Sequence, residues 1–274
     1  MSYQRILTVQ DISCVGQCSM TVALPILSAC GHEVCILPSA LLSTHTGGFV
    51  NPAVYSLKEC MDPIWHHWKR EGIRFNAIYT GYLGSLEAIG TVFKIIDELL
   101  APGGKVIVDP AMADHGKLYR GFDNEYACAM KELCLRSDVM IPNITEAAMM
   151  SGLPYLETFD EEYIRSLMDG LGGKDVVLTG VAFKPGMTGA AIRSNGNISF
   201  CLHERYDRNF HGTGDIFASA FTGAWMHDKS MEEAVRISSG FTCRSIYHTI
   251  ENPVHAYGVK FEAALPDLIR ALQL

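Results

Sequence analysis

The sequence has no apolar run long enough to cross a membrane, because a spanning helix needs about 18 or more such residues in succession. Its first residues, Met-Ser-Tyr-Gln-Arg-Ile-Leu-Thr, also lack the apolar core of a signal peptide. Positive charge is scarce: 22 Lys and Arg stand against 30 Asp and Glu, a net charge of −8, so the chain carries no overall electrostatic footprint for nucleic acid. We therefore expect a cytoplasmic protein that binds neither membranes nor nucleic acid.

Paired Cys-x-x-Cys modules are absent, although the chain contains nine cysteines. An odd number of cysteines, spread from Cys14 to Cys243, favours reduced thiols over a disulfide framework. Cys14 and Cys18 lie four residues apart near the first predicted loop, where either a structural or a redox role is compatible with the sequence.

Two common nucleotide-binding motifs are missing as well. The chain contains no Gly-x-x-x-x-Gly-Lys-Ser/Thr segment, which excludes a P-loop enzyme. No Gly-x-Gly-x-x-Gly follows the first predicted strand, so a dinucleotide-dependent oxidoreductase is excluded too.

Apolar residues are plentiful, at 48% of the chain, whereas charged residues make up 19%. This balance predicts a compact protein with a sizeable buried core. No Ser-, Pro- or Gly-rich linker, charge block or internal repeat divides the sequence. We expect residues 1–274 to form a single domain.

Short β-branched runs alternate with segments of helical spacing, which is typical of an α/β fold with a central, mostly parallel sheet. Late in the chain, Asn195-Gly196 predicts an antiparallel hairpin, because both residues tolerate the positive φ of a tight turn. The predicted buried strands are 6–9, 34–37, 77–80, 106–108, 139–141 and 176–178, the hairpin strands are 190–193 and 198–202, and the late helices are 213–227, 231–249 and 259–272.

Polar residues stand at the ends of four predicted strands, namely Asp11, Asp109, Asn143 and Thr179. In parallel α/β sheets, ligands bind beyond the carboxyl ends of the strands, so this placement predicts a site there. Asp and Asn at such places also cap helices and turns, and that structural interpretation stands beside the functional one.

The most specific segment is His211-Gly212-Thr213-Gly214-Asp215, which opens a predicted helix. Glycines allow backbone N–H groups to face a ligand, and the helix dipole adds partial positive charge, so the segment predicts an anion site suited to a phosphoryl group. Asp215 fits a general base that accepts a proton from a substrate hydroxyl, and it also fits an ordinary first-turn carboxylate.

Six segments in order make the chain similar to the ribokinase superfamily, and within it to the pyridoxal kinases and the related hydroxymethylpyrimidine kinases. The resemblance implies a three-layer α/β/α ribokinase-like fold, Mg²⁺, ATP as phosphoryl donor and a homodimer, and it leaves a monovalent cation open. The six segments are Val9-Gln10-Asp11, Ser43-Thr44-His45-Thr46-Gly47-Gly48, Thr80-Gly81-Tyr82-Leu83-Gly84, Val108-Asp109-Pro110-Ala111-Met112-Ala113-Asp114, Pro142-Asn143-Ile144-Thr145-Glu146-Ala147 and Gly212-Thr213-Gly214-Asp215.

The resemblance also implies the site residues. Asp215 matches the general base of the family, and its anion hole matches Gly212, Thr213 and Gly214. The alcohol substrate would be bound by Asp11, Thr46, Tyr82 and Asp215. The nucleotide would be bound by Asp109, Asp114, Tyr119, Asn143, Glu146, Thr179 and Thr213, of which Asp109, Asn143 and Glu146 would hold Mg²⁺, partly through water.

One position departs from the pyridoxal kinase pattern. Asp11 stands where many pyridoxal kinases carry Ser and looks more like the hydroxymethylpyrimidine kinases, whereas His45-Thr46-Gly47 looks more like the pyridoxal branch. A carboxylate beside a ring nitrogen would favour cationic ligands.

We expect a kinase, an enzyme that transfers a phosphoryl group from ATP to the 5′-hydroxymethyl group of a vitamin B6 vitamer (pyridoxal, pyridoxamine or pyridoxine) in pyridoxal 5′-phosphate salvage. The alternative is a hydroxymethylpyrimidine kinase of thiamine synthesis. An alternative from another class is a non-catalytic vitamer-binding protein.

Overall fold

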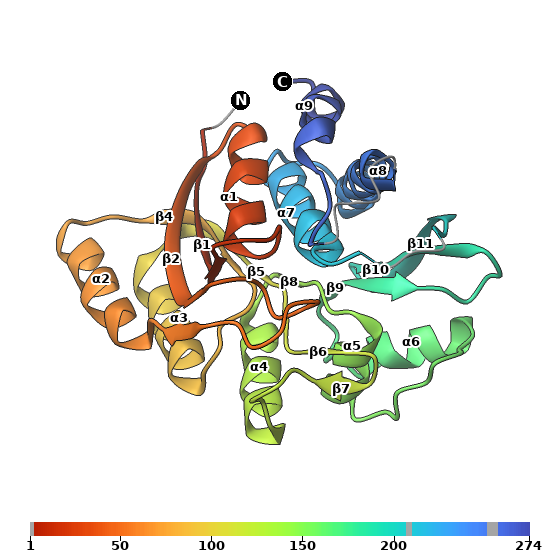
Figure 1. The fold of residues 1–274 in the computed structure, drawn as a ribbon, viewed down its shortest axis with the longest axis horizontal. Coiled ribbons are helices and arrows are strands. Elements are labelled where there is room, and N and C mark those ends of the chain that lie inside the picture. The colour runs from red at the N-terminus through yellow and green to blue at the C-terminus, as the bar shows by residue number, and fades with distance from the viewer. Residues whose placement is uncertain (1–2, 207–209, 251–256) are drawn as a thin grey trace. The chain divides into compact units, whose positions relative to one another are not determined.

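The computed structural model describes residues 3–206, 210–250 and 257–274 (Figure 1). The chain divides into two compact units: unit 1 consists of Met1–Lys105 and Arg208–Leu274, and unit 2 of Val106–Asp207. In the described part of the chain, no helix combines the length and the apolarity that crossing a bilayer requires.

The strands of unit 1 follow the order β4 (Phe75–Thr80), β1 (Arg5–Ser13), β2 (Glu33–Leu42) and β3 (Val54–Ser56). β1 pairs in parallel with both β2 and β4, while β3 runs antiparallel to β2 at the edge. Ile6, Leu7 and Val9 of β1 are fully buried, as expected for a strand that is apolar on both faces. This burial makes β1 the centre of the unit.

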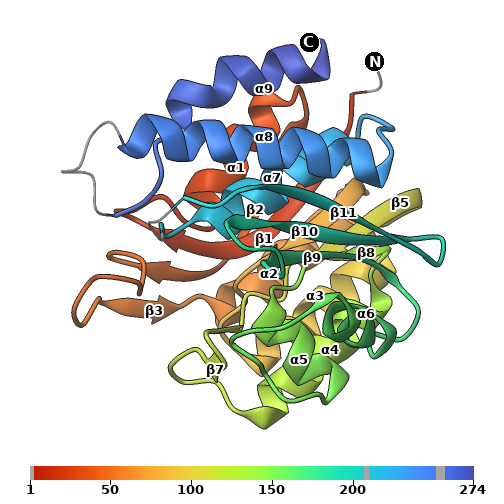
Figure 2. The same cartoon turned by 90° about the vertical axis from the view of Figure 1, so that its right-hand side faces the viewer.

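Helices cover both faces of these strands (Figure 2). One face carries α1 (Met20–Ala29), α7 (Thr213–Trp225), α8 (Met231–Ile250) and α9 (Leu265–Leu272), which η1 (Glu262–Ala264) precedes. The other face carries α2 (Lys58–Arg70) and α3 (Leu86–Leu99). Residues 216–224 of α7 are all buried, which explains the small and apolar sequence that follows Asp215.

The strands of unit 2 follow the order β5, β8 (Val139–Met140), β9 (Asp175–Val181), β10 (Met187–Ser194) and β11 (Asn197–Glu204). β5 spans Leu100–Val108, and its last three residues belong to this unit. β5, β8 and β9 are parallel, and β10 and β11 form the antiparallel hairpin. Its helices are α4 (Asn124–Arg136), α5 (Ile144–Ser151) and α6 (Glu161–Asp169), and a separate small hairpin pairs β6 (Ala113–Asp114) with β7 (Lys117–Leu118).

The predicted mixed α/β fold, with a mostly parallel sheet and a late antiparallel hairpin, is confirmed. Asn195 and Gly196 have φ angles of 50° and 81°, as the predicted turn requires. The last helix is shorter than predicted, since its α-helical part begins at Leu265. β3, β6 and β7 were not predicted, because two or three residues are too few to show a periodicity.

Asp11 does not end its strand, as the sequence pattern suggested, because β1 continues to Ser13. The pairing with β2 shifts register between Gln10 and Ile12, so Asp11 lies at an irregularity of the ladder. Such bulges turn a side chain out of its regular alternation and are frequent beside functional sites. Thr179 likewise lies inside β9, which continues to Val181.

Candidate active site

In unit 1, the candidate site is built on the start of α7. Gly212 caps this helix with a left-handed φ of 79°, and a Cβ there would lie 2.0 Å from the carbonyl oxygen of Gln17. The tight turn therefore requires glycine. Among the described residues, no side chain caps the first turn of α7, and Gly214 within it is exposed. A helix start with this geometry offers backbone N–H groups and the positive end of the dipole to an anion.

A cluster of rings lies next to this helix start. The ring of His45 has its centroid 5.4 Å from that of His211, the residue before Gly212, and 5.0 Å from that of Phe49. The Nε2 atom of His45 contacts the carbonyl oxygen of Tyr257 at 3.2 Å. His45 is buried and Thr46 beside it is exposed. The cluster thus fixes the segment that carries Thr46 against the segment that opens α7.

Two carboxylates of unit 1 lie close to Cys18. Burial, together with the negative charges of Asp215 and Asp11, raises the pKa of the Cys18 thiol far above its usual value. The pKa of Tyr82 is raised by burial and by the charge of Asp11. The structure therefore brings Asp11, Cys18, Tyr82 and Asp215 into one neighbourhood, and a thiol held protonated in this way is a poor nucleophile.

Asp11 is almost fully buried, with 4% of its surface exposed. Its Oδ2 accepts a hydrogen bond from the Ser13 hydroxyl at 3.0 Å. Burial raises the pKa of Asp11, although hydrogen bonds from Ser19 and Ser13 act in the opposite direction. A buried carboxylate without a cation beside it is costly, so this position favours a ligand that brings positive charge.

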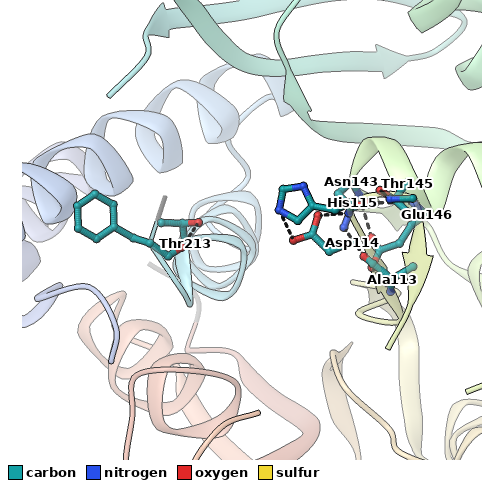
Figure 3. Close-up of polar contacts among 9 residues, drawn as sticks. Ala113, Asp114, His115, Asn143, Thr145, Glu146 and Thr213 are labelled. Atoms are coloured by element: carbon teal, nitrogen blue, oxygen red, sulfur yellow. Dashed lines mark hydrogen bonds and ion pairs between the residues drawn. The ribbon is translucent and has the colours of Figure 1, made fainter. Parts of the chain in front are cut away.

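In unit 2, the candidate residues gather around the start of α5 (Figure 3). Asn143 and Glu146 form a capping box there: Asn143 Oδ1 accepts the N–H of Glu146 at 2.9 Å, and Glu146 Oε2 accepts the N–H of Asn143 at 2.8 Å. Glu146 Oε1 also accepts the N–H groups of Met112 at 3.0 Å and Ala113 at 3.4 Å. Glu146 therefore joins α5 to the segment that leads into β6.

Thr179 and Asp109 flank the same helix start. The N–H of Thr179 donates to the carbonyl oxygen of Pro142 at 2.8 Å, and its hydroxyl donates to the same oxygen at 3.3 Å. Asp109 follows β5 directly, and its Oδ1 accepts the N–H of Ala111 at 3.2 Å. Its Oδ2 takes no hydrogen bond from the described residues.

Asp114 and Tyr119 belong to the hairpin that follows Ala113. Asp114 Oδ1 accepts the N–H of His115 at 2.8 Å, and Asp114 Oδ2 lies 3.6 Å from His115 Nε2. The N–H of Tyr119 donates to the carbonyl oxygen of Met112 at 2.8 Å. All six candidate residues of unit 2 therefore lie on or beside connected segments, with the side chains of Asp114 and Tyr119 exposed.

The donor set of unit 2 suits Mg²⁺. Burial raises the pKa of both Asp109 and Glu146, and the charge of Glu146 adds to the shift of Asp109. Two neighbouring carboxylates that burial makes costly to ionise are the kind of oxygen ligands that a hard divalent cation stabilises. The described residues contain no group of three or more His, Cys, Asp or Glu placed to hold a metal ion.

Sequence reasoning missed two features of the site. Thr145 is buried and bonds to the hairpin, and Cys18 lies close to both carboxylates of unit 1. Neither has a local signal, because the partner of Thr145 is 29 residues away and Asp215 is far from Cys18 in sequence.

Comparisons with known proteins show the family of this chain. The family model described as phosphomethylpyrimidine kinase matches residues 67–259. The pyridoxal kinase of Lactobacillus plantarum is 32% identical, with 99% of this chain and 97% of that chain covered and a TM-score of 0.88. A Bacteroides thetaiotaomicron protein crystallised with pyridoxal is 32% identical, with coverage of 97% and 96% and a TM-score of 0.91. The pyridoxal kinase of Arabidopsis thaliana is 25% identical over 246 residues, 84% of this chain and 79% of that protein.

The matched family model covers well over half of the chain, and the Lactobacillus enzyme aligns with nearly all of it. The expected resemblance to pyridoxal and hydroxymethylpyrimidine kinases is confirmed. The chain belongs to the phosphomethylpyrimidine kinase family, with a ribokinase-like fold, and it is a phosphotransferase that has an alcohol group as acceptor.

Proposed function

We propose that this protein transfers the terminal phosphoryl group of ATP to the 5′-hydroxymethyl group of a vitamin B6 vitamer. The observation that carries the proposal is the start of α7, which no described side chain caps, with Asp215 in its first turn and Asp11 in the same neighbourhood. The similarity to a pyridoxal kinase and to a protein crystallised with pyridoxal, both at 32% identity, supports the vitamer as acceptor. The product would be the vitamer 5′-phosphate, made in salvage of pyridoxal 5′-phosphate.

Asp215 is the proposed general base. Its carboxylate takes the proton of the alcohol while the alcohol oxygen bonds to phosphorus and the bond from phosphorus to the leaving ADP oxygen breaks. The backbone N–H groups of Gly212, Thr213 and Gly214 hold the negative charge that develops on the transferred phosphoryl oxygens. Glycine at 214 supports this role, since a Cβ there would meet no protein atom within 4 Å and the space is open to a ligand.

Asp109, Asn143 and Glu146 are the proposed residues for Mg²⁺. Asp109 Oδ2 is the best placed direct ligand, because the oxygens of Glu146 already accept three backbone N–H groups. Asn143 and Glu146 would act through water. When bound, Mg²⁺ neutralises charge on the phosphates during transfer.

Asp114, Tyr119, Thr179 and Thr213 complete the proposed nucleotide site, in addition to the three residues for Mg²⁺. The hydroxyl of Thr213 donates to the carbonyl oxygen of Phe210 at 3.3 Å, so its oxygen keeps lone pairs for a further hydrogen bond.

Asp11, Thr46 and Tyr82 are the proposed residues for the alcohol substrate. Asp11 offers a buried negative charge, Tyr82 an aromatic face and Thr46 an exposed hydroxyl. A protonated pyridine ring, or the aminomethyl group of pyridoxamine, complements the charge of Asp11. Pyridoxal and pyridoxamine are the favoured vitamers.

Hydroxymethylpyrimidine is the second candidate acceptor. The description of the matched family supports it, and so does the carboxylate at Asp11. A homodimer in the cytoplasm, with a monovalent cation as an additional ion, stays a prediction of the sequence.

The decisive experiment is a set of parallel assays of ADP release with ATP and Mg²⁺. We expect the highest kcat/KM with a B6 vitamer among pyridoxal, pyridoxine, pyridoxamine and hydroxymethylpyrimidine. A higher kcat/KM for hydroxymethylpyrimidine would replace the proposal by the second candidate. Binding of a vitamer without ADP release would contradict both.

A further inference from the structure

We infer that Thr145 is a positioning residue for the nucleotide, and that it acts by fixing the tip of the hairpin formed by β6 and β7. The inference rests on the proposed function, which assigns Asp114 and Tyr119 of this segment to ATP. Thr145 itself has no assigned role in the proposed reaction.

The contact that carries the inference joins α5 to the hairpin turn. The hydroxyl oxygen of Thr145, which Figure 3 labels at the start of α5, accepts a hydrogen bond. Its donor is the N–H of Gly116, at 3.0 Å. Thr145 is 2% exposed, so water competes little for this hydrogen bond. The turn also packs on Tyr155, since a Cβ at Gly116 would lie 2.7 Å from Cδ1 of that ring.

The hairpin is too small to hold its own shape. β6 and β7 contain two residues each, and an isolated two-stranded hairpin is marginal in water even when it is longer. Its turn places both His115 and Gly116 at positive φ, 49° and 75°, which is unfavourable for His. The geometry of the turn therefore depends on contacts from outside the hairpin.

Those contacts come from Asn143, Thr145 and Glu146 at the start of α5 and act at two levels. At the base of the hairpin, Asn143 Nδ2 donates to the carbonyl oxygen of Ala113 at 2.8 Å, and Glu146 accepts the N–H of Ala113. At the tip, Thr145 holds Gly116. The base would stay anchored without the Thr145 hydroxyl, whereas the tip would lose its bond to α5.

Asp114 is the side chain whose placement follows from this anchor. It is exposed, and its Oδ1 atom bonds to the N–H of His115, so its orientation depends on the turn that Thr145 fixes. A side chain held in its binding orientation loses less conformational freedom when the ligand arrives. Loss of the anchor should therefore weaken ATP binding and leave the binding of the alcohol unchanged.

The test uses Thr145→Val, which keeps the shape of the side chain and removes the hydroxyl, and Thr145→Ser, which keeps the hydroxyl. We expect Thr145→Val to accelerate hydrogen exchange of the Gly116 amide and to raise both the Kd of ATP with Mg²⁺, by calorimetry, and the KM for ATP about 3- to 10-fold, as the loss of one hydrogen bond implies. The KM for the vitamer should change less than about 2-fold, and Thr145→Ser should restore both ATP constants.

Thr91→Val is the matched control. Thr91 is 5% exposed and donates to Asp62 Oδ1 at 3.0 Å in unit 1, so this variant also loses one hydrogen bond of a buried threonine. The inference would be overturned if Thr145→Val left the Kd of ATP or the hydrogen exchange of the Gly116 amide unchanged. It would also be overturned if Thr91→Val raised the Kd of ATP equally. ATP binding and amide exchange are measured without an alcohol, so they decide the inference even if no vitamer is phosphorylated.

Discussion

Asn143 and Glu146 cap one another at the start of α5, each accepting the backbone N–H of the other, while Glu146 also accepts two N–H groups from Met112 and Ala113. One buried carboxylate thereby satisfies three backbone donors. Leaving buried donors unpaired is costly, at about 1–3 kcal/mol for each group. Glu146 is consequently a structural residue as well as a proposed contributor to the Mg²⁺ site.

We predict that Glu146→Ala lowers the free energy of unfolding by about 2–4 kcal/mol, because three backbone donors lose their acceptor. Glu146→Gln should lower the free energy of unfolding by less than half as much, since its amide oxygen can still accept some of the three backbone N–H groups. Urea denaturation followed by circular dichroism measures the difference. Equal losses in the two variants would mean that the carboxylate oxygens do not hold these donors.

Replacing Asp215 tests the proposed base. Asp215→Asn keeps the size of the side chain and removes its ability to take a proton, so we expect kcat to fall by about 10²- to 10⁴-fold. Binding of the vitamer should stay detectable, because binding does not need the proton transfer. The control Asp267→Asn, at a half-buried position at the start of α9, should turn over like the wild type. Steady-state kinetics with normal turnover in Asp215→Asn would remove the base from the mechanism.

A substitution at Gly214 can test the approach of a ligand without disturbing the packing of the protein. A Cβ at Gly214 would meet no protein atom within 4 Å, and Gly in a helix costs about 0.5–1 kcal/mol relative to Ala. We therefore expect Gly214→Ala to keep or raise the Tm and to lower kcat/KM for ATP at least about 10-fold, because the methyl group would occupy the phosphoryl position.

Gly240→Ala is the control for this prediction. Gly240 lies in α8, and a Cβ there would also meet nothing within 4 Å. This variant should gain similar stability and keep full activity. Normal kcat/KM in Gly214→Ala would show that no ligand approaches this backbone.

Asp11 is expected to select for positive charge on the alcohol substrate. Asp11→Asn and Asp11→Ser both remove the buried charge, and Asn also keeps the shape and a hydrogen-bond acceptor for Ser13. We expect both variants to lower the ratio of kcat/KM for pyridoxamine to that for pyridoxal by about 10-fold, equivalent to about 1.4 kcal/mol. The same ratio in wild type and both variants would exclude the charge of Asp11 as a determinant of substrate selection.

The parallel strands could be predicted from the sequence because their signal is local. Residues 6–9 and 176–178 are apolar on both faces, and burial of both faces is what the structure shows for β1 and β9. The Asn195-Gly196 turn could be predicted for the same reason, since its φ angles depend on two adjacent residues.

Thr145, Cys18 and the bulge at Asp11 could not be predicted, because each depends on a partner far away in the sequence. The hydroxyl of Thr145 bonds to Gly116, the pKa of Cys18 is raised by burial and by the charges of Asp215 and Asp11, and the irregularity at Asp11 exists only in the pairing of β1 with β2. The candidate residues were chosen from the sequence alone, whereas the contacts that orient them required the tertiary structure.

His32 should make the stability of the protein depend on pH. His32 is 5% exposed, its Nε2 contacts the carbonyl oxygen of Gly223 at 3.0 Å, and its ring stacks on that of His227 with centroids 4.4 Å apart. Burial lowers the pKa of His32, and His227 adds to the shift, while the hydrogen bond to Gly223 opposes it. The unfolded chain therefore binds a proton at this residue more readily than the folded protein does.

The contribution of His32 to the free energy of unfolding is consequently complete above the ordinary pKa of histidine, about 6.5. It is lost as the pH falls through that value towards the lower pKa that His32 has in the folded state. We expect the wild-type free energy of unfolding to fall between pH 7.5 and pH 5.5, and the fall to be smaller in His32→Gln. The control His66→Gln removes an exposed histidine of α2 in the same way. Parallel slopes for wild type and His32→Gln would exclude His32 as the source of the dependence.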